Sequence, residues 1–326
     1  MYAHYHKGAP LKHRPLLYPI FGEKILKNSA LGSFVDAFSI ISVAAGTIGP
    51  IGFLGLQASY GLSDLFNISD TLMMQIFIIV LLVVAAAISA ASGVHRGIRI
   101  LSTYNVYLAL FLMATLLIIG PTLFITNSYL ESFATYIENF LTLNTYQGDE
   151  AWLSGWTIFF FAWFLGYGPM MVIFVARISR GRTIRQLVTA VAIIAPVIST
   201  FWFTVVGGTG IFQELMNPGV ISGPLNANGP PATMIAITDQ LPFGTILGFL
   251  FIIATIIFVL MTTDSMSLTI SMAITGSSDP SKLLRVFWAL LMGAVAVLLL
   301  TIGEDSVNSL QSFIVVTAVP VFFLML

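Results

Sequence analysis

Lys and Arg are confined to four clusters in this chain, and pairs of long apolar stretches separate one cluster from the next. All 13 of these cations lie within residues 7–27, 96–99, 177–185 and 282–285. The connection inside each apolar pair carries neither Lys nor Arg, and most of the acidic residues lie in these connections. Because Lys and Arg resist translocation during insertion, loops that carry them stay in the cytoplasm. The pattern predicts a multi-pass protein of the plasma or inner membrane with a cytoplasmic N-terminus.

Apolar stretches of spanning length make up most of the chain. Of its residues 57% are hydrophobic and 8% are charged, whereas soluble domains carry about 25% charged residues. A helix needs about 20 apolar residues to cross the hydrocarbon core. By that criterion we predict eight spans, at residues 30–57, 71–94, 101–127, 152–176, 187–213, 243–264, 283–303 and 308–326. We therefore expect an all-α integral membrane protein.

The segments outside the spans also have a recognisable character. Residues 128–145 place apolar side chains at helical spacing on one face and acidic ones on the other, which predicts an amphipathic helix on the outer surface. Residues 216–231 are rich in Gly, Pro and Asn and predict a loop. The basic segment 1–29 is typical of a cytoplasmic loop, and residues 308–326 end without flanking polar residues. We expect this chain to be a portion of a longer protein.

The composition gives no support to an enzyme or a nucleic-acid-binding protein. The chain has no Cys, and its four His residues lie in predicted cytoplasmic segments without a metalloprotease pattern or a phosphate-binding loop. The net charge of −1 supplies no basic surface for nucleic acid. We therefore expect no catalytic residues, no metal site and no nucleic-acid partner, and the lipid bilayer as the main surroundings.

Aromatic residues crowd the predicted span 152–176. Phe159, Trp163 and Tyr167 recur every four residues and so share one face of a helix. The Gly-Tyr-Gly-Pro sequence at 166–169 predicts a loosened helix at mid-span. An aromatic face beside a helix break suits a quaternary ammonium cation, which the faces of aromatic rings attract. The alternative is that these rings only pack against lipid and neighbouring helices.

Two further features lie in the predicted spans. Asp264 closes the span 243–264 at its cytoplasmic edge. An ionisable residue in a span indicates a function and a partner, and Arg177 is our candidate partner; the alternative is that Asp264 faces water. In the first span, the Gly-rich stretch 46–55 predicts close helix packing or, alternatively, a deformable helix near a site.

Several short motifs together resemble one transporter family. The run Ala-Arg-Ile-Ser-Arg-Gly-Arg follows the aromatic span, and further matches occur at residues 19–24, 55–57, 92–98, 207–209 and 264–265. From about residue 15 to its end, the chain resembles the betaine/choline/carnitine transporter family. The resemblance implies a secondary transporter with twelve helices, ten of which form two inverted five-helix repeats around a substrate near the midplane.

The resemblance also implies how this chain maps onto that architecture. Residues 30–127 would be the last three helices of repeat one, and residues 152–326 would be the whole of repeat two. Residues 128–145 would be the outer amphipathic helix, through which the family forms homotrimers. The peripheral helices and the first two core helices would be missing, and residues 1–29 would be a cytoplasmic segment.

A substrate cage is implied on the aromatic span. Trp163 keeps the place of a cage Trp, Phe164 and Tyr167 occupy neighbouring Trp positions, and Phe159 matches a lining position. We expect these residues, with Trp156, to bind the substrate. The cage would hold less Trp than is usual in the family, and Trp has the strongest cation–π face.

The resemblance implies coupling-ion ligands at Thr47, Phe258, Thr262 and Thr263. Val43 and Met261 stand where sodium-coupled members carry Thr, and a thioether is a poor ligand for a hard cation. Val106 stands where sodium-independent members carry an ion-mimicking Arg. Na⁺ and H⁺ therefore both stay open as the coupling ion, and we expect no other cofactor.

The resemblance predicts a secondary active transporter that moves a compatible solute such as glycine betaine, choline or carnitine by alternating access. Its partner would be a small quaternary-ammonium or zwitterionic solute. Arg177 and Asp264 match gate positions, and we expect them to pair when the inner pathway is closed. Three alternatives stay open: a transporter of the same fold for another solute such as an amino acid, a channel, and a truncated membrane protein that does not transport.

Overall fold

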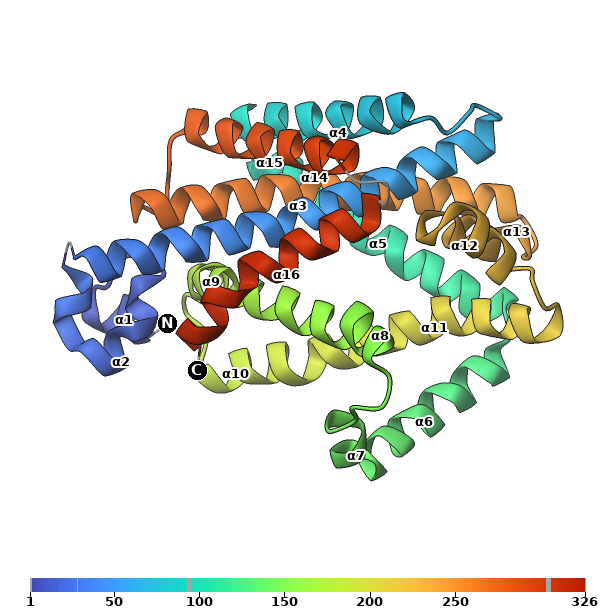
Figure 1. The fold of residues 1–326 in the computed structure, drawn as a ribbon, viewed down its shortest axis with the longest axis horizontal. Coiled ribbons are helices and arrows are strands. Elements are labelled where there is room, and N and C mark those ends of the chain that lie inside the picture. The colour runs from blue at the N-terminus through green and yellow to red at the C-terminus, as the bar shows by residue number, and fades with distance from the viewer. Residues whose placement is uncertain (1, 28, 93–94, 303–305, 326) are drawn as a thin grey trace.

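The protein is a bundle of helices, seen here in a computed structural model that describes residues 2–27, 29–92, 95–302 and 306–325 (Figure 1). Eight helical runs in the described part are long and apolar enough to cross a membrane. Their main helices are α3 (Ala30–Phe66), α4 (Leu72–Ser92), α5 (His95–Ile119), α9 (Phe159–Ile178), α11 (Ala195–Met216), α14 (Gly244–Thr275), α15 (Lys282–Ile302) and α16 (Ser306–Met325). The predicted all-α architecture and the number of spans are confirmed.

Shorter helices extend or connect these runs. α8 (Glu150–Trp152) and the π-helical turn Leu153–Ile158 lead into α9, and α10 (Ile184–Val188) and the π-helical turn Thr189–Ile194 lead into α11. The others are α1 (Tyr2–Lys7), η1 (Arg14–Leu17), α2 (Tyr18–Phe21), η2 (Gly22–Leu26), α6 (Thr122–Glu138), α7 (Phe140–Asn144), α12 (Ser222–Asn228), η5 (Pro230–Ala232) and α13 (Thr233–Asp239).

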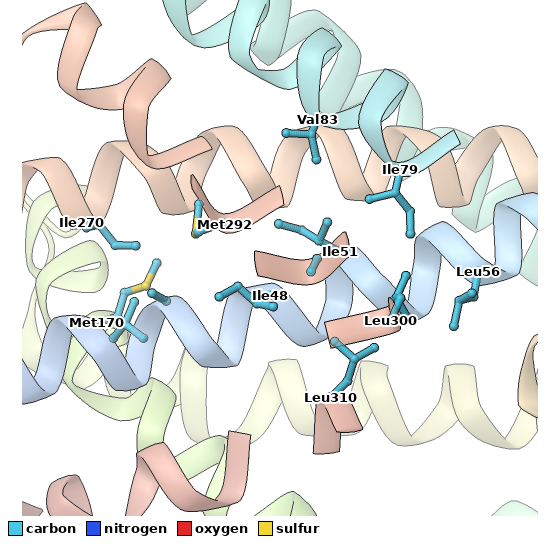
Figure 2. Close-up of a cluster of buried hydrophobic side chains, with 13 residues drawn as sticks. Ile48, Ile51, Leu56, Ile79, Val83, Met170, Ile270, Met292, Leu300 and Leu310 are labelled. Carbon is cyan, nitrogen blue, oxygen red and sulfur yellow. The ribbon is translucent and has the colours of Figure 1, made fainter. Parts of the chain in front are cut away.

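α3 is the centre of the packing. It contacts α14, α4 and α15, which also contact one another, and on another side it contacts α9 and α16. The main core cluster lies along α3, where Ile48 and Ile51 meet Val83 of α4, Met292 of α15 and Leu310 of α16 (Figure 2). α5, α6 and α11 form a second group around α14.

Glycines let the neighbours of α3 approach its backbone. A Cβ atom at Gly49 would lie 2.4 Å from Ile314 Cδ1, and one at Gly55 would lie 2.4 Å from Ile79 Cγ1. Neither distance leaves room for a side chain. Between helices in lipid, association depends on such close van der Waals packing because lipid tails are as apolar as the side chains. α3 runs unbroken through the Gly-rich stretch 46–55, so close packing is the structural role of that stretch.

Several predicted boundaries were wrong. The third span ends at Ile119 and not at 127, because Pro121 lacks a backbone N–H and the next helix, α6, starts at Thr122. The amphipathic segment 128–145 is helical, as α6 and α7, but belongs to this longer element. The predicted loop 216–231 contains α12 and part of η5. The predicted span ends at 94, 303 and 326 lie outside the described residues.

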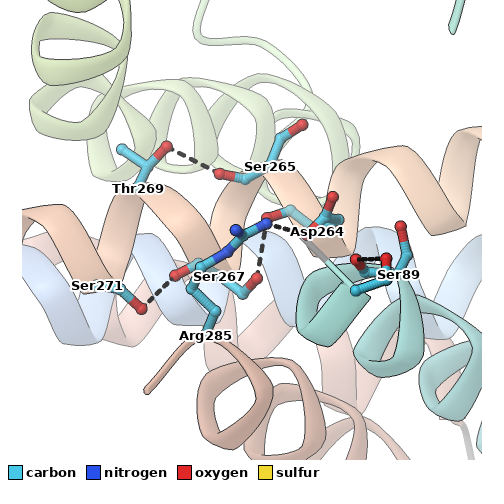
Figure 3. Close-up of polar contacts among 8 residues, drawn as sticks. Ser89, Asp264, Ser265, Ser267, Thr269, Ser271 and Arg285 are labelled. Carbon is cyan, nitrogen blue, oxygen red and sulfur yellow. Dashed lines mark hydrogen bonds and ion pairs between the residues drawn. The ribbon is translucent and has the colours of Figure 1, made fainter. Parts of the chain in front are cut away.

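α14 continues eleven residues beyond the predicted end at Asp264, to Thr275. The added residues are rich in Ser and Thr, which are weak helix formers because their hydroxyls compete for backbone groups. Here the hydroxyls bond to carbonyls one turn back in the same helix. Ser267 donates to Asp264 at 2.8 Å and Thr275 to Ser271 at 2.8 Å. Ser271 donates to Ser267 at 2.6 Å (Figure 3). The helix stops at Gly276, whose φ of 71° favours glycine.

The predicted loosening of the aromatic span at residues 166–169 was also wrong. α9 is α-helical from Phe159 to Ile178 and contains Pro169. The irregular turn lies earlier, in the π-helical residues Leu153–Ile158. Gly166 serves packing, since a Cβ atom there would lie 2.5 Å from Ser42 Oγ of α3.

The basic N-terminal segment folds onto the bundle. Arg14 and Asp36 of α3 form a buried ion pair at 2.7 Å, and the Arg14 amide donates a second bond to the same carboxylate. Leu11 packs with Ile173 of α9 and Met272 of α14. His13, next to Arg14 in the sequence, is also buried. Desolvation lowers the pKa of His13 to about 4, although the negative charge of Asp36 acts in the opposite direction.

Candidate functional site

The aromatic face of α9 meets α3 and α14 through two hydrogen bonds. Trp163 Nε1 donates to the backbone carbonyl of Gly46 in α3 at 2.9 Å. Tyr167, one turn further along α9, donates its hydroxyl to the sulfur of Met266 in α14 at 2.9 Å. The Tyr167 hydroxyl also lies next to the side chain of Thr47. Trp163 and Tyr167 are thus held where α3, α9 and α14 come together.

The five predicted cage residues divide into two groups. Phe159 is buried and its ring lies 5.4 Å from that of Trp163, so it extends the inward-facing group. Phe164 stacks on Trp163 at 6.1 Å but is 68% exposed, and Trp156 is 57% exposed and stacks on Phe160. The structure therefore brings three of the five, Phe159, Trp163 and Tyr167, toward the bundle. It leaves Phe164 of α9 and Trp156 of the preceding π-helical turn exposed.

The predicted ion ligands also occupy more than one place. Thr47 is buried and its hydroxyl donates to the Val43 carbonyl at 2.9 Å. Thr263 is buried, and its hydroxyl has no hydrogen-bond partner in the described part of the chain. Because Thr263 precedes Met266 by three residues, it lies on the same side of α14 as the Tyr167 contact. Thr47 and Thr263 are thus the two buried candidates on the side of the aromatic site.

Phe258 and Thr262 lie on a different face of α14 from Thr263. Phe258 is exposed and lines an apolar groove with Val106 of α5 and Trp202 of α11. Thr262, four residues later, shares that face and is half-buried. The side chain of Phe258 is therefore directed away from the aromatic pair, whereas Thr262, four residues before Met266, lies between the face of Phe258 and that of Met266.

The predicted pairing of Arg177 with Asp264 is not formed in this structure. Asp264 bonds instead to Arg285 of α15, Nη2 to Oδ1 at 2.9 Å (Figure 3). Arg177 Nη1 contacts the sulfur of Met272 at 2.9 Å. Asp264 is not at the end of its helix, as we predicted, but buried within it. A buried carboxylate requires a cation or several donors nearby, and Arg285 faces α14 from the first turn of α15.

Sequence reasoning missed Arg285, although a signal was present. Lys282 and Arg285 open α15, and the apolar run begins between them. An Arg inside an apolar run is costly unless it is paired, whereas Lys282 at the helix start is exposed. The position of Arg285 therefore already indicated a partner. Gly46 and Met266 were also missed as contacts of the aromatic pair.

Comparison with known proteins identifies the family. The model of the BCCT, or betaine/carnitine/choline transporter, family matches residues 1–326. The chain belongs to this family. The resemblance seen in its sequence motifs is confirmed, and so is its assignment as a multi-pass membrane protein.

Three curated relatives illustrate the similarity. Glycine betaine transporter 2 of Vibrio parahaemolyticus is 51% identical over 326 residues, which are 100% of this chain and 60% of the relative. Glycine betaine transporter 1 of the same organism is 34% identical over 99% of this chain and 62% of its own length. The ectoine/glycine betaine/proline transporter EctP of Corynebacterium glutamicum is 32% identical over 98% of this chain and 52% of its own length. The chain thus spans little more than half the length of these relatives.

Proposed function

We propose that this protein is a secondary active transporter for a compatible solute, with glycine betaine as the first candidate. The observation that carries the proposal is the inward-facing aromatic group of α9, with Trp163 and Tyr167 held against α3 and α14. Membership in the betaine/carnitine/choline family and the names of the relatives support it. Such a role requires binding and movement but no catalytic group.

The aromatic pair would bind the trimethylammonium group of the solute. A quaternary ammonium cannot donate a hydrogen bond from nitrogen, so the negative faces of aromatic rings are its best partners, worth about 2 kcal/mol when desolvated. The indole edge of Trp163 is bonded to Gly46 and the Tyr167 hydroxyl to Met266, so both rings are oriented through their polar edges.

Alternating access would break and remake these contacts. In transporters built from inverted repeats, one bundle of helices rocks against another around the solute. Here the α3, α4, α14 and α15 group forms one body, and α9 touches it through the Trp163–Gly46 and Tyr167–Met266 bonds. Movement of α9 relative to α3 would change both bonds together with access to the solute. The charge pattern predicts that the N-terminal segment lies on the cytoplasmic side of that movement.

We propose Na⁺ as the coupling ion, with Thr47 and Thr263 among its ligands and H⁺ as the alternative. Hard cations take oxygen ligands, and Thr263 offers a buried hydroxyl without a hydrogen-bond partner among the described residues. Thr47 lies next to Tyr167, so an ion there would be close to the solute. Met261 lines a small cavity together with Asp264, and neither Thr47 nor Thr263 lines that cavity.

A homotrimer is a further part of the proposal. α6 and α7 expose a row of large apolar side chains, including Leu130, Phe133 and Ile137. A row of this kind on the rim of the molecule suits contact with lipid or with another copy of the chain.

The test is uptake of labelled glycine betaine by cells that express the complete gene, with and without a sodium gradient. We expect saturable, sodium-dependent uptake that Trp163→Ala abolishes and that Phe203→Ala, an exposed aromatic of α11, leaves intact. Sodium-independent uptake would favour H⁺. Absence of uptake would contradict the proposed solute.

Proline is the second candidate solute, because three relatives are named as transporters of both glycine betaine and proline. Competition of unlabelled proline against labelled glycine betaine distinguishes the two. Stronger inhibition by proline than by unlabelled glycine betaine would make the amino acid the preferred solute.

A further inference from the structure

We propose that Pro50 is a positioning residue for the substrate site: it leaves the Gly46 carbonyl free to accept the Trp163 indole and so sets the affinity for a quaternary-ammonium solute. The predicted effect on solute affinity rests on the proposed function. The predicted effect on the orientation of the Trp163 indole rests only on the contacts in the structure.

The argument begins with the helical register of α3. In an α-helix the carbonyl of residue 46 accepts the N–H of residue 50. Residue 50 is a proline inside α3, and proline has no N–H to donate. The Gly46 carbonyl therefore lacks its ordinary intrahelical partner. In a membrane-spanning segment an unpaired carbonyl is costly, so it requires a donor from elsewhere.

Trp163 supplies that donor. Its Nε1 lies 2.9 Å from the Gly46 oxygen, which is a normal hydrogen-bond distance. The proline ring also crowds the carbonyl of the residue four positions earlier and tilts it away from the helix axis. That tilt directs the acceptor toward the neighbouring helix α9, where Trp163 lies.

Gly46 adds the space that this arrangement needs. A Cβ atom at residue 46 would lie 2.8 Å from Tyr167 Cδ2 and 3.5 Å from Trp163 Cδ1. Both rings of the aromatic pair therefore rest on the bare backbone of α3. Glycine at 46 and proline at 50 act together: one lets the rings approach, and the other frees the acceptor that fixes the indole.

The test substitution is Pro50→Ala, which returns an N–H to residue 50. The restored intrahelical bond turns the Gly46 carbonyl back along the helix axis and away from the indole. Loss of one net hydrogen bond predicts that Kd for glycine betaine rises about fivefold. The thermal unfolding midpoint should not fall, because alanine favours a helix interior more than proline does. Damage to the fold would instead raise Kd and lower the unfolding midpoint together.

Two matched variants separate positioning from general effects. Pro320→Ala makes the same change inside α16, where the carbonyl that Pro320 leaves free belongs to Val316, an exposed residue, so Kd should not change. Trp163→Phe removes the indole N–H and keeps a ring. If Pro50 acts through that N–H, Pro50→Ala has no further effect on Kd in the Trp163→Phe background. An equal effect of Pro50→Ala in both backgrounds would overturn the inference.

A second measurement does not depend on the solute. In the full-length protein labelled with ¹⁵N at tryptophan, Trp163→Phe identifies the Trp163 indole resonance. Pro50→Ala should shift that resonance and accelerate its exchange with solvent more than it does for the other Trp residues. An unchanged Trp163 resonance would refute the inference even if betaine binds. If the wild-type protein fails to bind betaine but the resonance shifts as expected, the proposed solute is wrong and the positioning role stands.

Discussion

The buried pair of Asp264 and Arg285 gives the sharpest prediction about stability. Its side chains are 3% and 9% exposed and 2.9 Å apart, so each charge depends on the other for compensation. Asp264→Asn would leave the Arg285 guanidinium buried without its counter-charge. Removing one partner of a buried ion pair costs about 3–5 kcal/mol, because the remaining charge is stranded in a low-dielectric environment.

The assay is thermal unfolding of the purified full-length protein in detergent. A loss of that size predicts that the unfolding midpoint falls by roughly 5–10 °C for Asp264→Asn. Asp279→Asn, which alters an exposed acid in the connection between α14 and α15, is the control and should change the midpoint little. The double variant Asp264→Leu/Arg285→Met removes both charges and should be more stable than either single change.

Exchanging the two charges of a pair then decides whether Arg285 or Arg177 is the partner of Asp264. Asp264→Arg/Arg285→Asp restores an ion pair in the same place and should recover part of the midpoint, whereas Asp264→Arg/Arg177→Asp should not. Our reasoning is refuted if Asp264→Asn unfolds at the wild-type temperature. It is also refuted if the exchange with Arg177 rescues the protein better than the exchange with Arg285.

Three more predictions follow from single positions. Gly46→Ala should raise KM for the solute by displacing Tyr167, whereas Gly207→Ala, where a Cβ meets nothing within 4 Å, should not; equal KM values in uptake assays would contradict the packing argument. Thr263→Val should raise the Na⁺ concentration needed for half-maximal uptake if the hydroxyl is a ligand, and unchanged sodium dependence would exclude it. His13 has a folded pKa of about 4 against 6.5 unfolded, so the unfolded chain binds more protons between these values, and stability is lost as pH falls through this range. The loss should be about 2 kcal/mol at pH 5 and absent in His13→Leu, as measured by protease sensitivity of the N-terminal segment; identical pH profiles of the two proteins would refute it.

The sequence predicted the number and order of the spanning helices because each is a long apolar run, but it predicted their ends poorly. Hydropathy falls at Asp264, yet α14 continues with most of its residues 267–273 buried, and the Ser267 and Ser271 hydroxyls bond to carbonyls of the preceding turn. Conversely, the third apolar run continues past residue 119, but Pro121 interrupts the helix there. Apolar character alone therefore does not decide where a helix ends.

The sequence predicted which residues of one helix form the candidate site. It did not predict the contacts that these residues make with other helices. The four-residue spacing correctly placed Phe159, Trp163 and Tyr167 on one face. It could not show that Phe164, next to Trp163, points outward. The partner of Asp264 was ambiguous because the predicted topology brings several cations to the same side, and only helix packing selects Arg285.

The central claim is that α9 binds a betaine-like solute and carries it across the membrane by alternating access. Counterflow tests it most directly: proteoliposomes of the full-length protein are loaded with unlabelled glycine betaine and diluted into a trace of labelled solute. We predict transient accumulation of label above the outside concentration, and no accumulation with Trp163→Ala. Equilibration without overshoot would indicate a channel, and wild-type counterflow by Trp163→Ala would contradict the site.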